Sequence, residues 1–132
     1  MFIRSYASAE PFQTKDGSII RSLLDLGTAP VKAQSLAEAT VPAGLATTRH
    51  RHPLTEEFYY ITAGSGVLEI DGETRTVGVG DACLIPAGAT HQIYNQGPGE
   101  LKILCCCAPP YSHEDTLLLD DGPAVAGRPK KN

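Results

Sequence analysis

Hydrophobic residues come in short runs that glycine or proline interrupts every few residues. The 13 glycines and 10 prolines leave stretches too short for most helices. These stretches are rich in Val, Ile, Leu, Tyr and Thr, as strands are. The pattern predicts strands over Ile19–Leu26, Ser35–Val41, Ala46–His52, Glu57–Ala63, Gly66–Ile70, Glu73–Val77, Asp81–Ile85, His91–Asn95 and Leu101–Ala108. A further short strand is expected near Met1–Arg4.

Turn residues between these runs favour an all-β fold. Asp71-Gly72 predicts a tight hairpin, because both central residues of that turn need positive φ. Many short strands at close spacing are typical of a β-barrel or sandwich. Residues 31–39 could begin a helix, since Ala, Gln, Leu and Glu favour helices, but the segment is short and we expect a strand.

Composition and charge narrow the class of protein. A chain of 132 residues, 42% hydrophobic and 20% charged, fits one globular domain over residues 1–119, followed by a flexible tail at 120–132. The net charge of −4 disfavours nucleic acid and anionic membrane as partners. No apolar run approaches the roughly 20 residues of a membrane span. Residues 1–10 lack the apolar core of a secretion signal, so we expect a cytoplasmic protein.

His50 and His52 are the first sign of chemistry. Residues two apart on a strand point to the same face, so the two imidazoles can grip one metal ion together. Glu57 should lie on the adjacent strand, and His91 begins a later one. Three imidazoles and one carboxylate suit divalent Fe, Mn, Zn, Ni, Cu or Co better than calcium or magnesium. Taken alone, the His pair is weak evidence for a metal site, because histidines are more often surface or hydrogen-bonded residues.

The spacing around these residues resembles the two motifs of the cupin superfamily. The first motif, over residues 44–64, is matched by Gly44, His50, His52, Glu57 and Gly64. The second, over residues 80–95, is matched by Gly80, Pro86, Gly88, His91 and Asn95. Every defining position of both motifs is filled, which makes the resemblance specific.

This resemblance implies an all-β cupin double-stranded β-helix, or jelly-roll barrel. It implies one divalent transition metal inside the barrel, held by His50, His52, Glu57 and His91. The family usually leaves positions on that metal for water, substrate or dioxygen. Many single-domain cupins are homodimers that exchange an N-terminal strand, so we expect a homodimer.

The function implied is that of a metal-dependent enzyme acting on a small oxygenated metabolite. Cupins with this ligand set include dioxygenases, decarboxylases, sugar isomerases and epimerases, polyketide cyclases and lyases. Glu57 would remain a ligand or leave the metal and act as a base. The alternatives are a non-catalytic, metal-dependent module that binds a sugar or metabolite, and a structural or storage barrel. The full set of four polar ligands disfavours the last.

Tyr59 is the second catalytic candidate. Tyr59 and Ile61 share the strand face of Glu57 and should point into the barrel, whereas Phe58 and Tyr60 should point outward. The Tyr59 hydroxyl could bind substrate or donate a proton, although a buried tyrosine is more often part of the core.

The other reactive side chains are expected to be structural or solvated. Cys105 and Cys107 share one strand face and Cys106 takes the other; core packing is favoured over a redox role for them and for Cys83. We expect Asn95 to be structural and Tyr94 and Gln92 to face away from the metal. We expect solvated side chains at Arg49, Arg51, Arg75, Tyr111 and His113, of which the last two could touch substrate if their loop covers the barrel mouth.

Overall fold

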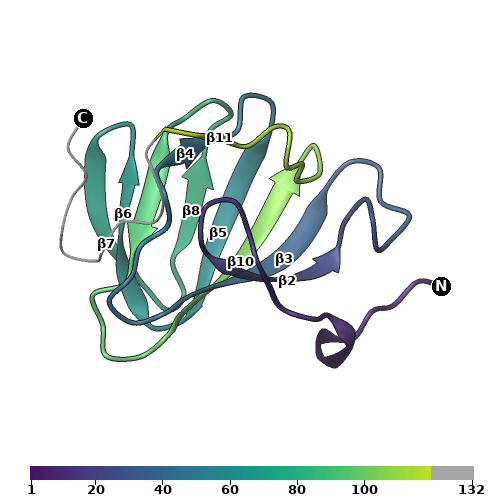
Figure 1. The fold of residues 1–132 in the computed structure, drawn as a ribbon, viewed down its shortest axis with the longest axis horizontal. Coiled ribbons are helices and arrows are strands. Elements are labelled where there is room, and N and C mark those ends of the chain that lie inside the picture. The colour runs from purple at the N-terminus through teal and green to yellow at the C-terminus, as the bar shows by residue number, and fades with distance from the viewer. Residues whose placement is uncertain (120–132) are drawn as a thin grey trace.

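Two antiparallel β-sheets face each other in the computed structural model, which describes residues 1–119 (Figure 1). The six-stranded sheet contains, in spatial order, β1 (Phe12–Gln13), β2 (Ile19–Leu24), β3 (Ser35–Val41), β10 (Leu101–Ala108), β5 (Glu56–Ala63) and β8 (Ala82–Ile85). The five-stranded sheet contains β11 (Leu117–Leu118), β4 (His50–Arg51), β9 (His91–Tyr94), β6 (Ser65–Ile70) and β7 (Glu73–Gly78). The expected all-β jelly-roll architecture is confirmed.

Helix is limited, within residues 1–119, to the single 3-10 turn η1 (Tyr6–Ser8). None of the helical structure in this range is long and apolar enough to cross a bilayer. The flexible tail expected at 120–132 lies outside the described residues.

The strand pattern differs from the prediction where pairing is brief or irregular. Residues 1–4 form no strand; the Arg4 guanidinium instead donates hydrogen bonds to the carbonyls of Leu23 and Ser22. Strands β1 and β11 have two residues each, too few to produce an alternation in the sequence.

The strand expected over residues 46–52 is reduced to β4. Upstream of it, the Thr47 hydroxyl accepts a hydrogen bond from the amide of Ile93, which interrupts the regular ladder to β9. The ambiguous segment at residues 31–39 joins β3 from Ser35 onward, so the strand interpretation is confirmed.

The β6–β7 hairpin forms through the turn that the sequence predicts. Asp71 has φ 47° and Gly72 has φ 85°, as a two-residue hairpin turn with both central residues left-handed requires. Gly66 in β6 leaves room for its neighbours, because a Cβ there would lie 2.7 Å from the Tyr94 carbonyl oxygen of β9 and 2.9 Å from Leu101 of the opposite sheet.

The hydrophobic core occupies one half of the barrel interior. On β5, Tyr59 and Ile61 are buried while Phe58 and Tyr60 are exposed, which confirms the predicted parity. Ile61 packs opposite Ile103 of β10, and both belong to the same core cluster as Leu101 and Ile93. These four aliphatic side chains are at most 1% exposed.

Candidate metal centre

The four predicted ligand residues are brought together by three strands and one loop. His50 on β4 lies directly opposite His91 on β9 in the strand register. His52 follows β4, and Glu57 is the second residue of β5. All four side chains are buried, with exposed fractions between 0% and 6%. Their convergence inside the barrel agrees with the geometry expected from the sequence, and their role as ligands stays a prediction.

The distances within this cluster suit a single ion. The ligand atoms of the three histidines lie within 4.8 Å of one another. Glu57 Oε1 is 3.4 Å from His52 Nε2 and 3.6 Å from His91 Nε2. Two ligands that are each about 2.1 Å from a common ion lie about 3.0 to 3.4 Å apart in octahedral or tetrahedral geometry. The side chains therefore need only small movements to share an ion.

Each histidine ring is fixed through its Nδ1 atom. His50 Nδ1 donates to the Thr48 carbonyl at 2.7 Å, and His91 Nδ1 donates to the Ala89 carbonyl at 3.0 Å. His52 Nδ1 lies 3.2 Å from Thr116 Oγ1, whose own proton goes to the Ser112 carbonyl. In the neutral rings, these bonds leave the lone pair on Nε2, pointing into the cluster.

Two atoms of the cluster lack hydrogen-bond partners. Within residues 1–119, Glu57 Oε1 and His91 Nε2 are buried and make no hydrogen bond. Leaving a buried polar group unsatisfied costs roughly 1–3 kcal/mol. Both atoms carry lone pairs, so a cation between them would satisfy both. The donor set of three imidazoles and one carboxylate thus fits a divalent transition metal.

Burial and mutual attraction shift the proton affinities in this cluster. Burial acts to raise the pKa of Glu57, but its interactions with His52 and His91 outweigh burial and hold that pKa well below its usual value. Burial and the neighbouring His91 lower the pKa of His50 to about 4. Burial also opposes charge on His52, yet Glu57 raises its pKa. His50 is therefore neutral at pH 7 and ready to act as a ligand.

The pocket beside the cluster is lined by both sheets and has an empty volume of about 750 Å³, including its opening. Tyr59 lines it, with its ring centroid 6.1 Å from that of His91. Cys105 and Cys107 also face inward, and the Cys107 thiol donates to Glu57 Oε2 at 3.5 Å. All four cysteines of the chain are free thiols.

Asp16 is a pocket residue that sequence reasoning missed. It lies in the turn between β1 and β2, and its Oδ2 atom is 3.5 Å from His50 Nε2. The sequence around it, Thr-Lys-Asp-Gly-Ser, carries only the signal of a polar turn. No spacing rule connects it to the histidines, because the hairpin that delivers it lies outside both motifs.

Arg49 is buried beside Gln92 and is not solvated as expected. Arg49 is only 7% exposed and forms a bidentate ion pair with Glu69, at 3.1 and 2.7 Å. Gln92 is 4% exposed and donates to the Thr47 carbonyl. Both side chains point away from the cluster, as expected. Glu69 on β6 lies opposite Gln92 on β9. Its carboxylate attracts the Arg49 guanidinium, which therefore lies against the sheet and not in solvent.

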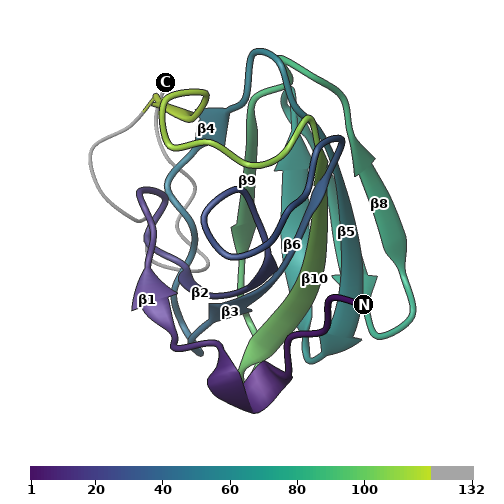
Figure 2. The same ribbon diagram turned by 90° about the vertical axis from the view of Figure 1, so that its right-hand side faces the viewer.

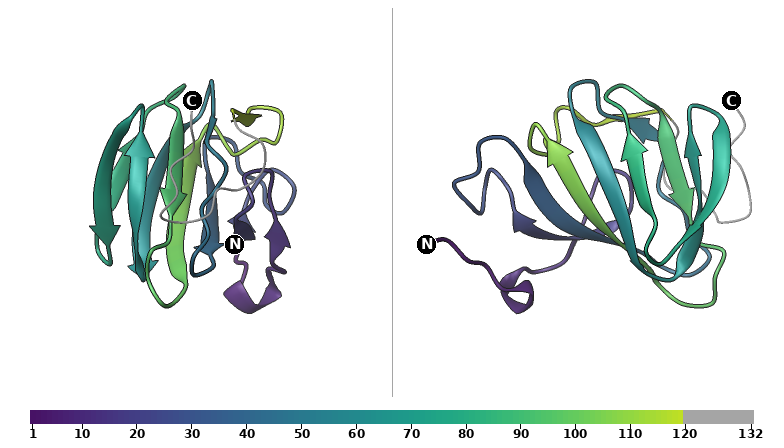
Figure 3. Two further views of the ribbon diagram at one scale, coloured as in Figure 1. Left: turned by 60° about the vertical axis from the view of Figure 1, so that its left-hand side comes forward. Right: turned by 180° about the vertical axis from the view of Figure 1, so that it is seen from behind.

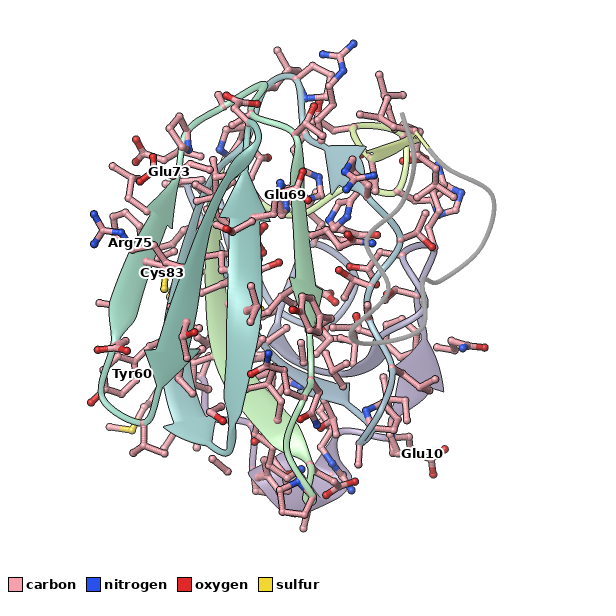
Figure 4. The ribbon with its side chains drawn as sticks, turned by 90° about the vertical axis from the view of Figure 1, so that its left-hand side faces the viewer. Glu10, Tyr60, Glu69, Glu73, Arg75 and Cys83 are labelled. Atoms are coloured by element: carbon pink, nitrogen blue, oxygen red, sulfur yellow. The ribbon has the colours of Figure 1, made fainter. Side chains whose placement is uncertain are left out.

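Three other secondary candidates, Arg75, Asn95 and His113, behave as the sequence predicts. The Arg75 side chain is 80% exposed and projects from β7 next to Glu73 (Figure 4). Asn95 is structural, because its amide donates to the Val41 and Gly99 carbonyls. His113 is exposed as expected, whereas Tyr111, which was expected to be solvated, is half-buried and lines the pocket.

A family model for the cupin domain matches residues 37–107, which is more than half of the chain. The chain belongs to the cupin family. This cupin is 50% identical over 115 residues to an uncharacterised protein of Methanocaldococcus jannaschii, a match that covers 87% of this chain and 92% of the relative. It is 28% identical over 95 residues to the polyketide synthase CurC of Streptomyces cyaneus, covering 72% and 62% of the two chains.

A solved structure supports the same fold. The crystal structure of a predicted oxalate decarboxylase from Thermotoga maritima superposes on this cupin with a TM-score of 0.71 at 26% identity. The match covers 82% of this chain and 98% of that protein.

Proposed function

We propose that this cupin is a metal-dependent enzyme that acts on a small oxygenated metabolite. One divalent transition ion (Fe, Mn, Zn, Ni, Cu or Co) would be held by His50, His52, Glu57 and His91. The observation that carries the proposal is the pair of buried, unpartnered atoms, Glu57 Oε1 and His91 Nε2, facing each other at 3.6 Å. An ion between them would satisfy the lone pairs of both atoms.

When bound, the ion would supply a Lewis acid that polarises a substrate oxygen. The protein contributes orientation, because Thr48 and Ala89 fix two of the rings through their carbonyl oxygens. Cys107 holds the second oxygen of Glu57, which keeps Oε1 directed at the histidines. Burial raises the pKa of Tyr59 well above its usual value, so its hydroxyl stays protonated and can donate a hydrogen bond to substrate.

The pocket supports a small substrate with several oxygens. Its walls combine apolar side chains such as Ile20 and Ile103 with serine and threonine hydroxyls. Oxalate and polyketides, named in the similar proteins, both carry adjacent or repeated oxygens that can chelate a metal. We propose the same substrate class here, with the reaction being an oxygenation, decarboxylation, isomerisation or cyclisation.

Metal analysis tests this proposal. The purified wild-type protein, dialysed against Fe²⁺, Mn²⁺ or Zn²⁺, should retain about one ion per chain. Glu57→Ala and His91→Ala should lose the ion and remain folded by circular dichroism, whereas the control His113→Ala, at an exposed position, should retain it. Retention of metal by the first two variants would refute the ligand assignment.

Substrate screening separates the enzyme from a binding module. Oxygen consumption and product formation would be measured for the metal-loaded protein with diketones, flavonols and small carboxylic acids. Turnover that His91→Ala abolishes supports the enzyme. Tight binding of one of these compounds without turnover would favour a metal-dependent metabolite-binding module.

We also propose that the protein is a cytoplasmic homodimer. The outer face of β5 and β8 exposes Phe58 and Leu84 at 54% each and Tyr60 at 46% (Figure 4 labels Tyr60). Large exposed apolar side chains that adjoin one another favour association. Light scattering should give twice the chain mass, and Phe58→Glu should give the monomer mass.

A further inference from the structure

The β1–β2 turn holds the carboxylate of Asp16 in one orientation. Its Oδ1 atom accepts hydrogen bonds from Thr14 Oγ1 at 2.8 Å, the Ser18 amide at 2.9 Å and Ser18 Oγ at 2.7 Å. Gly17 adopts φ 92°, a conformation that glycine reaches without strain. Three donors on Oδ1 leave Oδ2 directed at the pocket.

The turn itself is attached to both sides of the pocket. The Thr48 amide donates to the Asp16 backbone carbonyl at 2.7 Å, two residues before His50. Lys15 Nζ donates to the carbonyls of His113 and Thr116 at 3.0 and 2.9 Å. Figures 2 and 3 show the N-terminal hairpin and the segment leading to β11 lying side by side near β4. Asp16 is therefore held in place by residues from both ends of the described chain.

Asp16 Oδ2 and His50 Nε2 form a second pair of facing acceptors. They are 3.5 Å apart, and the proton of the neutral His50 ring is on Nδ1, where the Thr48 carbonyl accepts it. Glu57 Oε1 and His91 Nε2 face each other at a similar distance of 3.6 Å. Two acceptors without a proton between them repel, whereas two ligands of one ion lie at about this spacing.

We propose that Asp16 Oδ2 is a fifth protein ligand of the metal ion assigned above, an inference that rests on the proposed function. Two carboxylates, from Asp16 and Glu57, then neutralise one divalent charge in a largely buried site. An octahedral ion with five protein ligands would retain one position, so a chelating substrate would have to displace one of the carboxylates. The N-terminal hairpin, outside both sequence motifs, becomes part of the metal site.

The test compares Asp16→Asn with the matched control Asp25→Asn. Asp25 also sits in a turn and accepts hydrogen bonds from the amides of Gly27 and Thr28, but it pairs with none of the histidines. Affinities for Zn²⁺ and Co²⁺ would be measured by competition with a chelator, together with the visible absorption of the Co²⁺ forms. Thermal midpoints of the metal-free proteins would be recorded in parallel.

Asp16→Asn should bind Zn²⁺ at least about tenfold more weakly than wild type. Its Co²⁺ form should absorb more intensely, because Co²⁺ with fewer ligands has stronger visible bands. Its metal-free midpoint should stay equal or rise, since the Asn amide can donate to His50 Nε2 where the carboxylate could not. Asp25→Asn should leave the affinity and the Co²⁺ spectrum unchanged.

Unchanged Zn²⁺ affinity and an unchanged Co²⁺ spectrum in Asp16→Asn would overturn the inference. If the thermal midpoint of the metal-free variant were also lower, Asp16 would be assigned to turn structure alone. Should that variant not fold, a crystal structure of the Zn²⁺-loaded wild type decides: Asp16 Oδ2 within about 2.2 Å of the ion supports a ligand, and a longer separation excludes it. Failure of the wild type to bind any ion would instead refute the proposed function.

Discussion

The two halves of the barrel interior are built by the same strands with opposite chemistry. Along β5 the inward residues change from Glu57 through Tyr59 to Ile61, and along β10 they change from Cys107 to Ile103. The aliphatic half buries apolar side chains and supplies stability. The half with the histidines buries acceptors that lack partners, which costs stability in the metal-free protein. This division indicates that one part of the core supports a site in the other.

The largest expected effect comes from the aliphatic half. Ile61→Ala removes a fully buried side chain from the core cluster and should lower the free energy of unfolding by about 2–5 kcal/mol in urea titrations. The exposed neighbour Thr62 provides the control, since Thr62→Ala should change it by less than about 1 kcal/mol. Metal content per folded chain should be unchanged in both, and loss of metal in Ile61→Ala would show that the halves are not independent.

The histidine half should give the metal-free protein a stability maximum near pH 6.5. The folded pKa of His50 is about 4, below its ordinary 6.5, so the folded state binds fewer protons in this window. Stability therefore falls as pH drops from 6.5 toward 4, by at most about 1.4 kcal/mol per pH unit. The pKa of His52 is raised above 6.5, so its contribution is complete below pH 6.5 and is lost as pH rises through the folded pKa.

Urea unfolding between pH 4.5 and 8.5 would measure this profile. His50→Gln should reduce the loss of stability below pH 6.5, and His52→Gln should reduce the loss above pH 6.5. The control His113→Gln, at an exposed position, should alter neither. A wild-type profile that is flat across this range would mean that the buried rings do not titrate as the structure indicates.

The smallest effect on stability is expected at the boundary between the halves. Tyr59→Phe keeps the ring that packs in the core and removes the hydroxyl, so the free energy of unfolding should change by about 1 kcal/mol or less. If Tyr59 binds substrate, kcat should fall while metal content stays the same. Equal kcat in wild type and variant would assign Tyr59 to the core alone.

The sequence predicted those features that depend on alternation or on fixed motif spacing. Parity placed Glu57, Tyr59 and Ile61 inside the barrel, and the burial of β5 confirms it. Features that depend on a partner from elsewhere in the chain were not predicted. The alternation placed Arg49 on the correct side of its strand. Its burial was not predicted, because it depends on Glu69 from β6, another strand of the same sheet. Asp16 reaches the pocket only because the β1–β2 hairpin docks on Thr48.

The attachment of Lys15 to Thr116 determines when the pocket can form during protein synthesis. The carbonyls that accept from Lys15 belong to residues 113 and 116. Nearly all of the described chain must therefore be synthesised before these contacts at the pocket can form. The hydrogen bond that orients the His52 ring also needs Thr116, so it too forms late in synthesis. The proposed metal site would accordingly reach its final form only after residue 116 has been synthesised.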